Sequence, residues 1–280
     1  PTFALDLTSP HRVISTREAI HPGEIDMLSS EEVARFKRDG MVTVSNAVSS
    51  NLLARLQGDF ATWVAESRSH DAAYGSMIDG RPRFDVETGH SADAPALRRV
   101  SSPTEVSAAF GEAAFDSAMV NMVAALIGPS VRFHHSKINS KLPGSKTVVK
   151  WHQDFAYDPH SNDDVITALL FLDDVTPENG PLRVAPGSHT GAIHTLWHDG
   201  VFTGAVSEAV AAECENDPLI SMGEAGSVCL MHGRAAHASD INASDRARTL
   251  FIAVYAAADA IPLAPNPVPS DHAGQLVRGE

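Results

Sequence analysis

A histidine and an aspartate stand two positions apart in the run WHQDF at residues 151–155. Side chains two apart in a β-strand project to the same face, so His152 and Asp154 can bind one metal ion together. A third ligand must come from a distant strand, and the downstream segment offers His232 and His237. Two imidazoles and one carboxylate, with the remaining positions open, suit non-heme Fe(II) that also binds O2 and an organic ligand.

The residue types alone leave the metal and its third ligand open. Zn²⁺ can use the same three ligands together with a water molecule. Five residues separate His232 from His237, so the two need not face the same way. The chain has 14 histidines, and a hydrogen-bonded structural role is the simpler expectation for His134, His135, His160, His189, His194 and His198.

Arg248 stands at the start of an apolar run, Thr249–Tyr255, that predicts a strand. An arginine entering such a strand is costly unless it meets an anion, and its planar guanidinium matches a carboxylate. Ser239 follows His237 by two residues and could share that anion through its hydroxyl. Four lysines and no acidic residue fall within 137–150. They indicate a local positive field, although a solvated strand edge explains most of them.

Residues 67–104 are rich in glycine and proline and carry several arginines, among them Arg81, Arg83, Arg98 and Arg99. The weak periodicity predicts a long loop, and long loops within compact domains are often lids or binding loops. We expect this segment to cover the mouth of the metal pocket, with Arg81 or Arg83 binding an anionic group of the substrate. A solvated surface position is an equal alternative for any single arginine here.

Composition describes an acidic globular protein. Hydrophobic residues make up 43% of the 280 residues and charged residues 20%, which permits a packed core. A formal net charge of −14 argues against general binding to nucleic acid or anionic membranes. Two cysteines form no disulfide framework and fit a reducing cytoplasm. We see no signal peptide in residues 1–27 and no apolar stretch that approaches bilayer length. We therefore expect a cytoplasmic protein with a small-molecule substrate, and leave the oligomeric state open.

Helical patterns dominate the first half of the chain. Ser29 and Glu32 form a capping-box pattern for a helix that ends at Gly40. A stripe of apolar side chains predicts a second helix from Ser50 to Glu66, and its simplest explanation is core packing. The apolar run Ala108–Ile127 predicts a third helix, which Gly128 and Pro129 terminate.

Strand patterns dominate the second half. Six short runs separated by turn signals are typical of an all-β barrel or double-sheet roll: Val131–Ile138, Val148–His152, Val165–Leu172, Leu182–Val184, Ser227–Met231 and Thr249–Tyr255. A polar, alanine-rich insertion occupies residues 191–222. We predict one domain over 1–280, with an N-terminal arm (1–27), a helical part with the substrate loop (28–130), a β core (131–260) and an irregular tail (261–280).

The combined motifs resemble the phytanoyl-CoA dioxygenase family over roughly residues 28–255. The resemblance is carried by HQD at 152–154, LDDVTPENGPL at 172–182, PGSH at 186–189, MHG at 231–233 and HAS at 237–239. Gly226, Asn242, Arg248 and the opening LSSEE at 28–32, with Asp39 and Gly40, follow the same pattern. The resemblance implies an α+β protein with a mainly β core: a double-stranded β-helix (a cupin-like jelly roll) with N-terminal helices packed on it.

The same resemblance implies the cofactors Fe(II), 2-oxoglutarate and O2, and it implies roles for particular residues. The catalytic iron ligands would be His152, Asp154 and His237. Residues matching cosubstrate positions are Arg248 and Ser239 for the far carboxylate, Asn139 near the other end, and Thr167 in the same pocket. Arg246 is then the exposed neighbour without a role.

The implied reaction is hydroxylation of an unactivated C–H bond, with release of succinate and CO2. Related enzymes that halogenate have Gly or Ala in place of the carboxylate ligand, so Asp154 favours hydroxylation. The loop arginines favour a small carboxylated metabolite, such as an amino-acid derivative. Two alternatives are a Zn-dependent hydrolase or isomerase that uses the same triad, and a catalytically silent small-molecule binder or sensor on the same fold.

Overall fold

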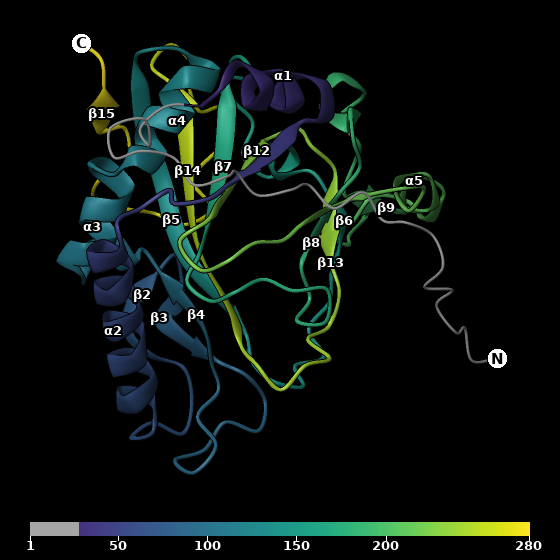
Figure 1. Cartoon of the computed structure of the whole chain (residues 1–280). Coiled ribbons are helices and arrows are strands. Elements are labelled where there is room, and N and C mark those ends of the chain that lie inside the picture. Colours follow the sequence, from purple (N-terminus) through teal and green to yellow (C-terminus); the bar gives the residue numbers. More distant parts are fainter. Residues whose placement is uncertain (1–27) are drawn as a thin grey trace.

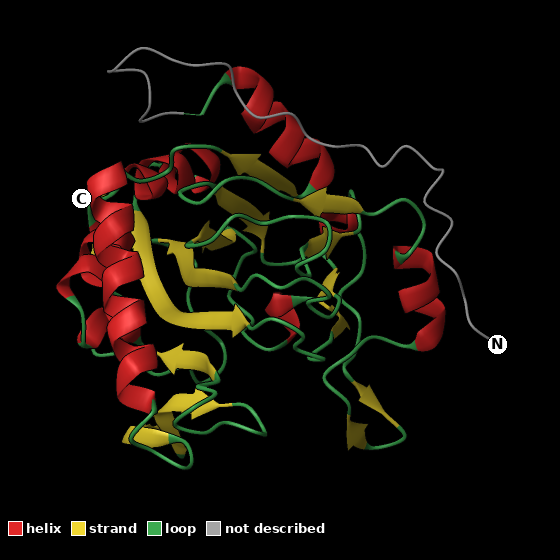
Figure 2. Cartoon of the chain, turned by 60° about the horizontal axis from the view of Figure 1, so that its bottom comes forward, coloured by secondary structure: helices red, strands yellow, loops and turns green. Residues whose placement is uncertain are grey.

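Two antiparallel sheets form the centre of the protein, and helices cover the outer face of the larger one (Figures 1 and 2). The computed structural model describes residues 28–280, so the arm expected at 1–27 lies outside the described residues. The arrangement confirms the double-stranded β-helix that the strand pattern and the resemblance predicted. Its two sheets provide facing inner surfaces, where a ligand can be enclosed.

The larger sheet contains the long central strands. Its order is β1 (Met41–Val44), β12 (Val228–His232), β7 (Val165–Phe171), β14 (Arg248–Ala257), β5 (Val131–Lys141), β4 (Leu97–Ser101), β3 (Arg81–Val86) and β2 (Tyr74–Ile78), with β15 (Leu276–Arg278) also paired to β5. Every pairing is antiparallel. Strand β14 is buried along its whole length, which explains its nearly continuous apolar sequence.

The smaller sheet is built from short strands. Its order is β11 (Leu219–Ser221), β8 (Leu182–Val184), β13 (His237–Ser239) and β6 (Val149–His152). The insertion at 191–222 adds a separate hairpin of β9 (Trp197–His198) and β10 (Val201–Phe202), and the helix α5 (Glu208–Cys214). Strands β6 and β13, which carry three of the predicted site residues, are neighbours in this sheet.

The first two helices begin where the sequence predicted. Helix α1 (Ser30–Asp39) has the expected capping box: Ser29 accepts a hydrogen bond from the Glu32 backbone, and Glu32 accepts one from the Ser29 backbone. Gly40 ends the helix at a φ of 82°, a left-handed conformation that glycine adopts easily. Helix α2 spans Ser50–Ser67, with Ser49 as its N-cap.

The expected third helix is two helices. Core-facing residues continue from α3 (Ala108–Phe115) into α4 (Ala118–Ile127). Between the two helices, Asp116 and Ser117 leave the helical conformation. By length and composition the range Ala108–Ile127 could cross a bilayer, contrary to the sequence-based expectation that no stretch approaches that length. In the fold, Phe110, Met119 and other side chains of this range are fully buried in the core under the larger sheet.

Residues 67–104 correct the prediction of a loop. They form a meander of β2, β3 and β4 that extends the larger sheet through the pairing of β4 with β5. The strands are hard to recognise because turn residues interrupt them and the outermost one, β2, is mostly exposed. The tail after 260 is irregular as predicted, except for β15. Three short 3-10 helices complete the fold: η1 (Pro103–Glu105), η2 (Asp154–Ala156) and η3 (Ser188–Thr190).

Two large apolar clusters pack against the opposite faces of the larger sheet. One lies between the helices and the outer face of the larger sheet, and includes Phe110, Phe133 and Phe251. The other lies between the two sheets, and includes Phe171 and Met231. Because both faces of the central strands are packed, the inner side chains of β5, β7 and β14 have little freedom to move.

Candidate metal and cosubstrate site

His152 and His237 are direct neighbours across strands β6 and β13, and their ring centroids lie 4.1 Å apart. The chain turns into η2 directly after His152, which brings Asp154 beside both rings. Its Oδ1 atom lies 3.6 Å from Nε2 of His152 and 3.7 Å from Nε2 of His237. The three ligand atoms lie within 4.8 Å of one another, so one metal ion can contact all three.

Backbone carbonyls fix which nitrogen each histidine presents. Nδ1 of His152 lies 2.8 Å from the oxygen of Lys150, and Nδ1 of His237 lies 3.0 Å from that of Ala235. A ring that donates from Nδ1 keeps its lone pair on Nε2, the atom that faces Asp154. Burial, with the nearby His152, lowers the pKa of His237 to about 4, so this ring is neutral at pH 7 and free to ligate.

The Asp154 carboxylate is oriented in the same way. Thr167 of β7 donates a hydrogen bond of 2.8 Å to Oδ2, which leaves Oδ1 for the shared position. Burial would raise the pKa of this carboxyl. The adjacent His237, His152 and Lys137 outweigh it and hold the pKa of Asp154 well below its usual range. The carboxylate is therefore ionised, as a metal ligand must be.

His232, the sequence-based alternative to His237, lies outside this group. Its ring packs 5.1 Å from that of His189 and 6.1 Å from that of Phe36, measured between centroids.

Gln153 stands between His152 and Asp154 in sequence, but it is fully buried and points away from them. Its amide donates to the oxygens of Ala192 and Arg234, which ties the HQD run to two loops.

A cavity of about 630 Å³ opens beside the three ligands and extends between the sheets. Its walls come from β5, β7 and β14 of the larger sheet and from β6 and β13 of the smaller one. The hairpin of the 191–222 insertion contributes Phe202, whose ring lies 5.8 Å from that of Tyr157. Tyr157 in turn lies 5.8 Å from the ring of His152. The sequence analysis identified neither aromatic residue.

One end of the cavity carries two buried cations. Arg248 of β14 stands opposite Lys141 of β5, and Ser239 of β13 lines the same end. Arg248 donates to the oxygen of Gly180 at 2.8 Å, while its Nε atom is buried without a hydrogen-bond partner. Burial lowers the pKa of Arg248 to about 10, and burial together with Arg248 lowers that of Lys141 to about 7. Two buried cations with an unused donor are suited to a carboxylate.

A second pair of cations lies nearer the metal ligands. Asn139 of β5 pairs with Arg99 of β4, and Lys137 lies two residues from Asn139 on the same face. All three line the cavity. Among residues 28–280, neither Arg99 nor Lys137 has a hydrogen-bond or ion-pair partner, and Nε of Arg99 is buried. Burial lowers the pKa of both side chains. The charges of Arg98 and Arg81 lower that of Arg99 further, and the charge of Arg99 lowers that of Lys137.

The two arginines proposed for the substrate lie in different environments. Arg81 is exposed and lines the mouth of the cavity. Arg83 is buried and lies outside the cavity wall, with its guanidinium bound by Glu105 at 2.6 Å and by the carbonyl of Ser102 at 2.6 Å. The structure brings Arg81 to the cavity and gives Arg83 an internal ion pair.

The sequence model of the phytanoyl-CoA dioxygenase (PhyH) family matches residues 36–250 of this chain. The chain belongs to the phytanoyl-CoA dioxygenase family. The match includes β1, β5, β6, β7 and β13, and it ends within β14, just after Arg248. It confirms the resemblance that the HQD run and the downstream motifs indicated.

Two curated relatives match this chain over part of their length. A probable alpha-ketoglutarate-dependent hypophosphite dioxygenase from Stutzerimonas stutzeri is 37% identical over 173 residues, which are 60% of this chain and 59% of the relative. L-proline trans-4-hydroxylase from Streptomyces griseoviridis is 30% identical over 158 residues, 49% of this chain and 59% of the relative. The chain thus spans about three fifths of the length of these two relatives.

Solved structures share the fold of this family member. EctD from S. alaskensis with bound Fe superposes with a TM-score of 0.69 and 22% identity, covering 95% of this chain and 91% of that one. The carbocyclase SnoK from nogalamycin biosynthesis gives a TM-score of 0.63 and 20% identity, covering 90% and 94%. At these identities the likeness supports the double-stranded β-helix and carries no residue roles.

Proposed function

We propose that this protein is an Fe(II)- and 2-oxoglutarate-dependent dioxygenase that hydroxylates a small anionic molecule and releases succinate and CO2. The observation that carries the proposal is the set of three oriented donors, two Nε2 atoms and one carboxylate oxygen, beside a cavity with buried cations. Family membership supports it, and so do relatives named as alpha-ketoglutarate-dependent or as hydroxylases.

The donor set fits Fe(II). Neutral imidazole and ionised carboxylate are ligands that Fe(II) accepts, and three protein ligands on one side leave positions for a chelating cosubstrate and O2. His152, Asp154 and His237 would hold the metal, which supplies O2 activation coupled to oxidation of the cosubstrate. Thr167 donates to Oδ2 of Asp154, which would leave Oδ1 for the metal. The two carbonyl-bound rings cannot rotate without breaking their Nδ1 hydrogen bonds.

The buried cation pair fits 2-oxoglutarate. Arg248 presents its unpaired Nε, Lys141 adds a second positive charge, and the hydroxyl of Ser239 faces the same end of the cavity. Together they would bind the carboxylate of 2-oxoglutarate that lies far from the metal. A carboxylate there would offset the cost of burying two like charges side by side. Asn139, farther along the same face of β5, would lie near the other end of the cosubstrate.

The remaining cations point to the charge of the substrate. Arg99 and Lys137 line the cavity and have no hydrogen-bond or ion-pair partner within residues 28–280, and the exposed Arg81 lines it as well. We propose that Arg99 binds an anionic group of the substrate, with Arg81 guiding it inward. The named activities of the relatives agree with a small charged molecule: hypophosphite is an anion, and L-proline carries a carboxylate. Arg83 takes no part, because Glu105 already neutralises it.

The experiment is a substrate panel assayed by succinate formation with Fe(II), ascorbate and 2-oxoglutarate. The panel pairs anions with neutral analogues: L-proline with its methyl ester, and hypophosphite with a neutral phosphinate ester. We expect stimulation of succinate formation by an anion and not by its neutral partner. The identity of the product then shows whether the enzyme oxidises carbon or phosphorus. A protein that forms no succinate with any compound, yet hydrolyses or merely binds one, would establish one of the two alternative functions.

The matched variants test the substrate anion. Arg99→Ala should raise the KM for the stimulating anion at least tenfold, because it removes the partner of a desolvated charge. Arg83→Lys, which keeps the internal ion pair outside the cavity, should leave that KM unchanged. Uncoupled succinate formation without substrate should survive in both. A tenfold rise in KM for 2-oxoglutarate instead would assign Arg99 to the cosubstrate.

A further inference from the structure

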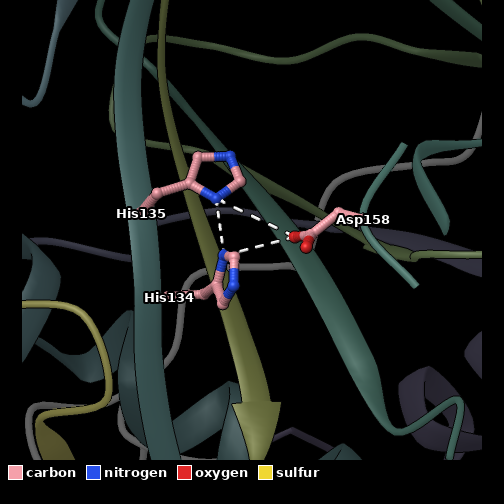
Figure 3. A group of neighbouring side chains, drawn as sticks. All are labelled: His134, His135 and Asp158. Carbon is pink, nitrogen blue, oxygen red and sulfur yellow. Dashed lines mark hydrogen bonds and ion pairs between the residues drawn. The ribbon is translucent and has the colours of Figure 1, made fainter. Parts of the chain in front are cut away.

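Two consecutive histidines of β5 turn their rings toward the same point. In a regular strand, His134 and His135 would project to opposite faces. The pairing of β5 with β14 shifts register at this place, and His134 has no partner residue. An extra residue of this kind forms a β-bulge, which re-aims side chains. Figure 3 shows both imidazoles converging with the carboxylate of Asp158, which comes from the segment after η2.

The three ligand atoms have the spacing of a metal site. The Nδ1 atoms of His134 and His135 lie 2.8 Å apart, and Oδ2 of Asp158 lies 3.2 Å from the first and 4.0 Å from the second. A point equidistant from the corners of this triangle lies about 2.0 Å from each, which matches Zn–N and Zn–O bond lengths. The 4.0 Å separation makes the angle between the His135 and Asp158 ligand atoms nearly straight at this point, so a tetrahedral zinc ion also requires these two side chains to move toward each other.

The two rings of the cluster are hydrogen-bonded to each other, but its carboxylate has no hydrogen-bond partner among the described residues. His134, His135 and Asp158 are 6%, 4% and 6% exposed. Neither carboxylate oxygen of Asp158 accepts a hydrogen bond, and Nε2 of the neighbouring His160 is also buried without a partner. A buried carboxylate left unpaired is costly. Burial lowers the pKa of both imidazoles, and burial together with Asp154 raises that of Asp158 to about 7, so all three groups are driven toward their neutral forms. A bound cation would stabilise the ionised carboxylate.

We propose that His134, His135 and Asp158 form a second divalent-cation site, separate from the His152–Asp154–His237 group and suited to Zn²⁺. Two imidazoles and one carboxylate favour zinc over Mg²⁺ or Ca²⁺, which prefer oxygen ligands. His135 and Asp158 also line the cavity, so the fourth position of the ion faces it and would take water or a ligand anion. Lys137 lies two residues from His135 on the same strand face, close enough to lower the pKa of that ring, and its positive charge would oppose the cation. The site would therefore bind less tightly than a closed structural zinc site.

Cation stoichiometry tests the proposal in the chain of residues 1–280. The double variant His152→Ala/Asp154→Ala removes the first site, and the probes are Zn²⁺ by calorimetry and Co²⁺ by its visible absorption. We expect two cations per wild-type chain and one per chain of the double variant. Co²⁺ bound to the double variant should show the strong visible absorption bands of four-coordinate Co²⁺. Adding Asp158→Asn to the double variant should abolish binding. Adding His189→Gln, a buried histidine outside both groups, should leave one cation.

Thermal unfolding gives a second readout, since a cation that binds only the native state raises the Tm. Zn²⁺ should raise the Tm of the double variant and not that of its Asp158→Asn derivative. If that derivative fails to fold, His134→Gln replaces it in both measurements. Absence of any cation in the double variant, or retention of one after Asp158→Asn and His134→Gln, overturns the proposal. Neither result depends on 2-oxoglutarate turnover, so the proposed function stands or falls separately.

Discussion

At the scale of single residues, hydrogen bonds made away from the metal position determine what the ligands can do. His152 and His237 each give Nδ1 to a backbone carbonyl two residues earlier, so both present Nε2. Asp154 gives one oxygen to Thr167 and keeps the other. No rotation is needed to form the metal site, and the entropic cost of assembling it has already been met in folding.

This arrangement predicts that the three ligands are indispensable. His152→Ala, Asp154→Ala and His237→Ala should each abolish turnover and reduce bound Fe(II), measured by calorimetry under anaerobic conditions. His232→Ala is the matched control, because its ring packs against His189 instead of the metal position. It should bind Fe(II) like the wild type, with some loss of stability from the vacated space. Iron binding that is lost in His232→Ala and kept in His237→Ala would reverse the assignment.

Arg248 and Arg246 give a second matched pair. Arg248 is buried at the closed end of the cavity, whereas the Arg246 side chain is 67% exposed and 3.4 Å from Asp174. Losing one partner of a buried charge pair costs about 2–5 kcal/mol. Arg248→Ala should therefore weaken 2-oxoglutarate binding roughly 30-fold or more, measured by calorimetry of the Ni²⁺-loaded protein. Arg246→Ala should change it less than twofold. Equal effects of the two substitutions would remove Arg248 from the cosubstrate site.

At the scale of elements, the turn before β8 positions the cosubstrate arginine. Gly180 has a φ of +77°, and its carbonyl accepts the hydrogen bond from Arg248. A Cβ atom at Gly180 would lie 2.7 Å from the backbone oxygen of Asp240 and 2.8 Å from that of Ile241. Neither oxygen can move without disturbing the loop that follows β13. The glycine thus serves both the conformation of the turn and the position of Arg248.

Gly144 provides the control for a substitution at Gly180. It has a φ of +71°, and a Cβ there would meet nothing within 4 Å. Gly144→Ala should lose only the left-handed preference of glycine, about 1–2 kcal/mol. Gly180→Ala should lose more, since backbone must also move, and it should weaken 2-oxoglutarate binding as well. Urea unfolding and calorimetry measure the two effects. The explanation fails if both variants lose equal stability and bind 2-oxoglutarate equally well.

The sequence predicted elements where one periodicity persists and missed them where it does not. The capping box of α1 and the buried strands β5, β7 and β14 have local signals that tertiary packing reinforces. Strand β13 has three residues, two of them with small side chains, and no alternation that could reveal it. Strands β2 and β3 contain a glycine and a proline, and β3 and β4 carry arginines, so the sequence resembles a loop. Pairing of β4 with β5 makes the three strands part of the sheet.

The same limit applies to the site. His152, Asp154, His237, Arg248 and Ser239 were identified from spacing and from the family resemblance, and the structure brings all five to one cavity. Lys141 was interpreted as part of a solvated edge because strand burial on one face cannot be read from charge alone. Arg83 was proposed for the substrate because it lies in an arginine-bearing segment that resembled a loop. Its ion-pair partner Glu105 is 22 residues away in sequence, so the pair has no local signal. The bulge at His134 depends on pairing with β14 and leaves no local signal.

At the scale of the whole molecule, an acidic protein encloses a cationic cavity. The chain has a formal net charge of −14, yet Arg248, Lys141, Arg99 and Lys137 all line the space between the sheets. In the absence of ligands, the folded protein reduces this internal repulsion by releasing a proton. Burial, and then the charge of Arg248, lowers the pKa of Lys141 from 10.5 to about 7.

This shift predicts how stability depends on pH. Between about pH 7 and pH 10 the unfolded chain keeps the Lys141 proton that the native apo protein has released. Because the unfolded state then binds more protons, the free energy of unfolding increases with pH, by on the order of 1 kcal/mol per pH unit from this group. Below pH 7 both states are protonated, and the contribution of Lys141 no longer changes with pH.

Urea unfolding of the metal-free and 2-oxoglutarate-free protein from pH 6.5 to 9.5 measures this dependence, and two variants isolate it. Lys141→Met should unfold with a smaller slope against pH than the wild type, and it should be more stable than the wild type near pH 6.5, where the buried charge is costly. Lys146→Met removes an exposed lysine five residues away and should keep the wild-type slope. Identical slopes in wild type and Lys141→Met would mean that Lys141 keeps its proton in the folded apo protein. Its positive charge would then be present at every pH in this range, and 2-oxoglutarate would meet two permanent cations at the closed end of the cavity.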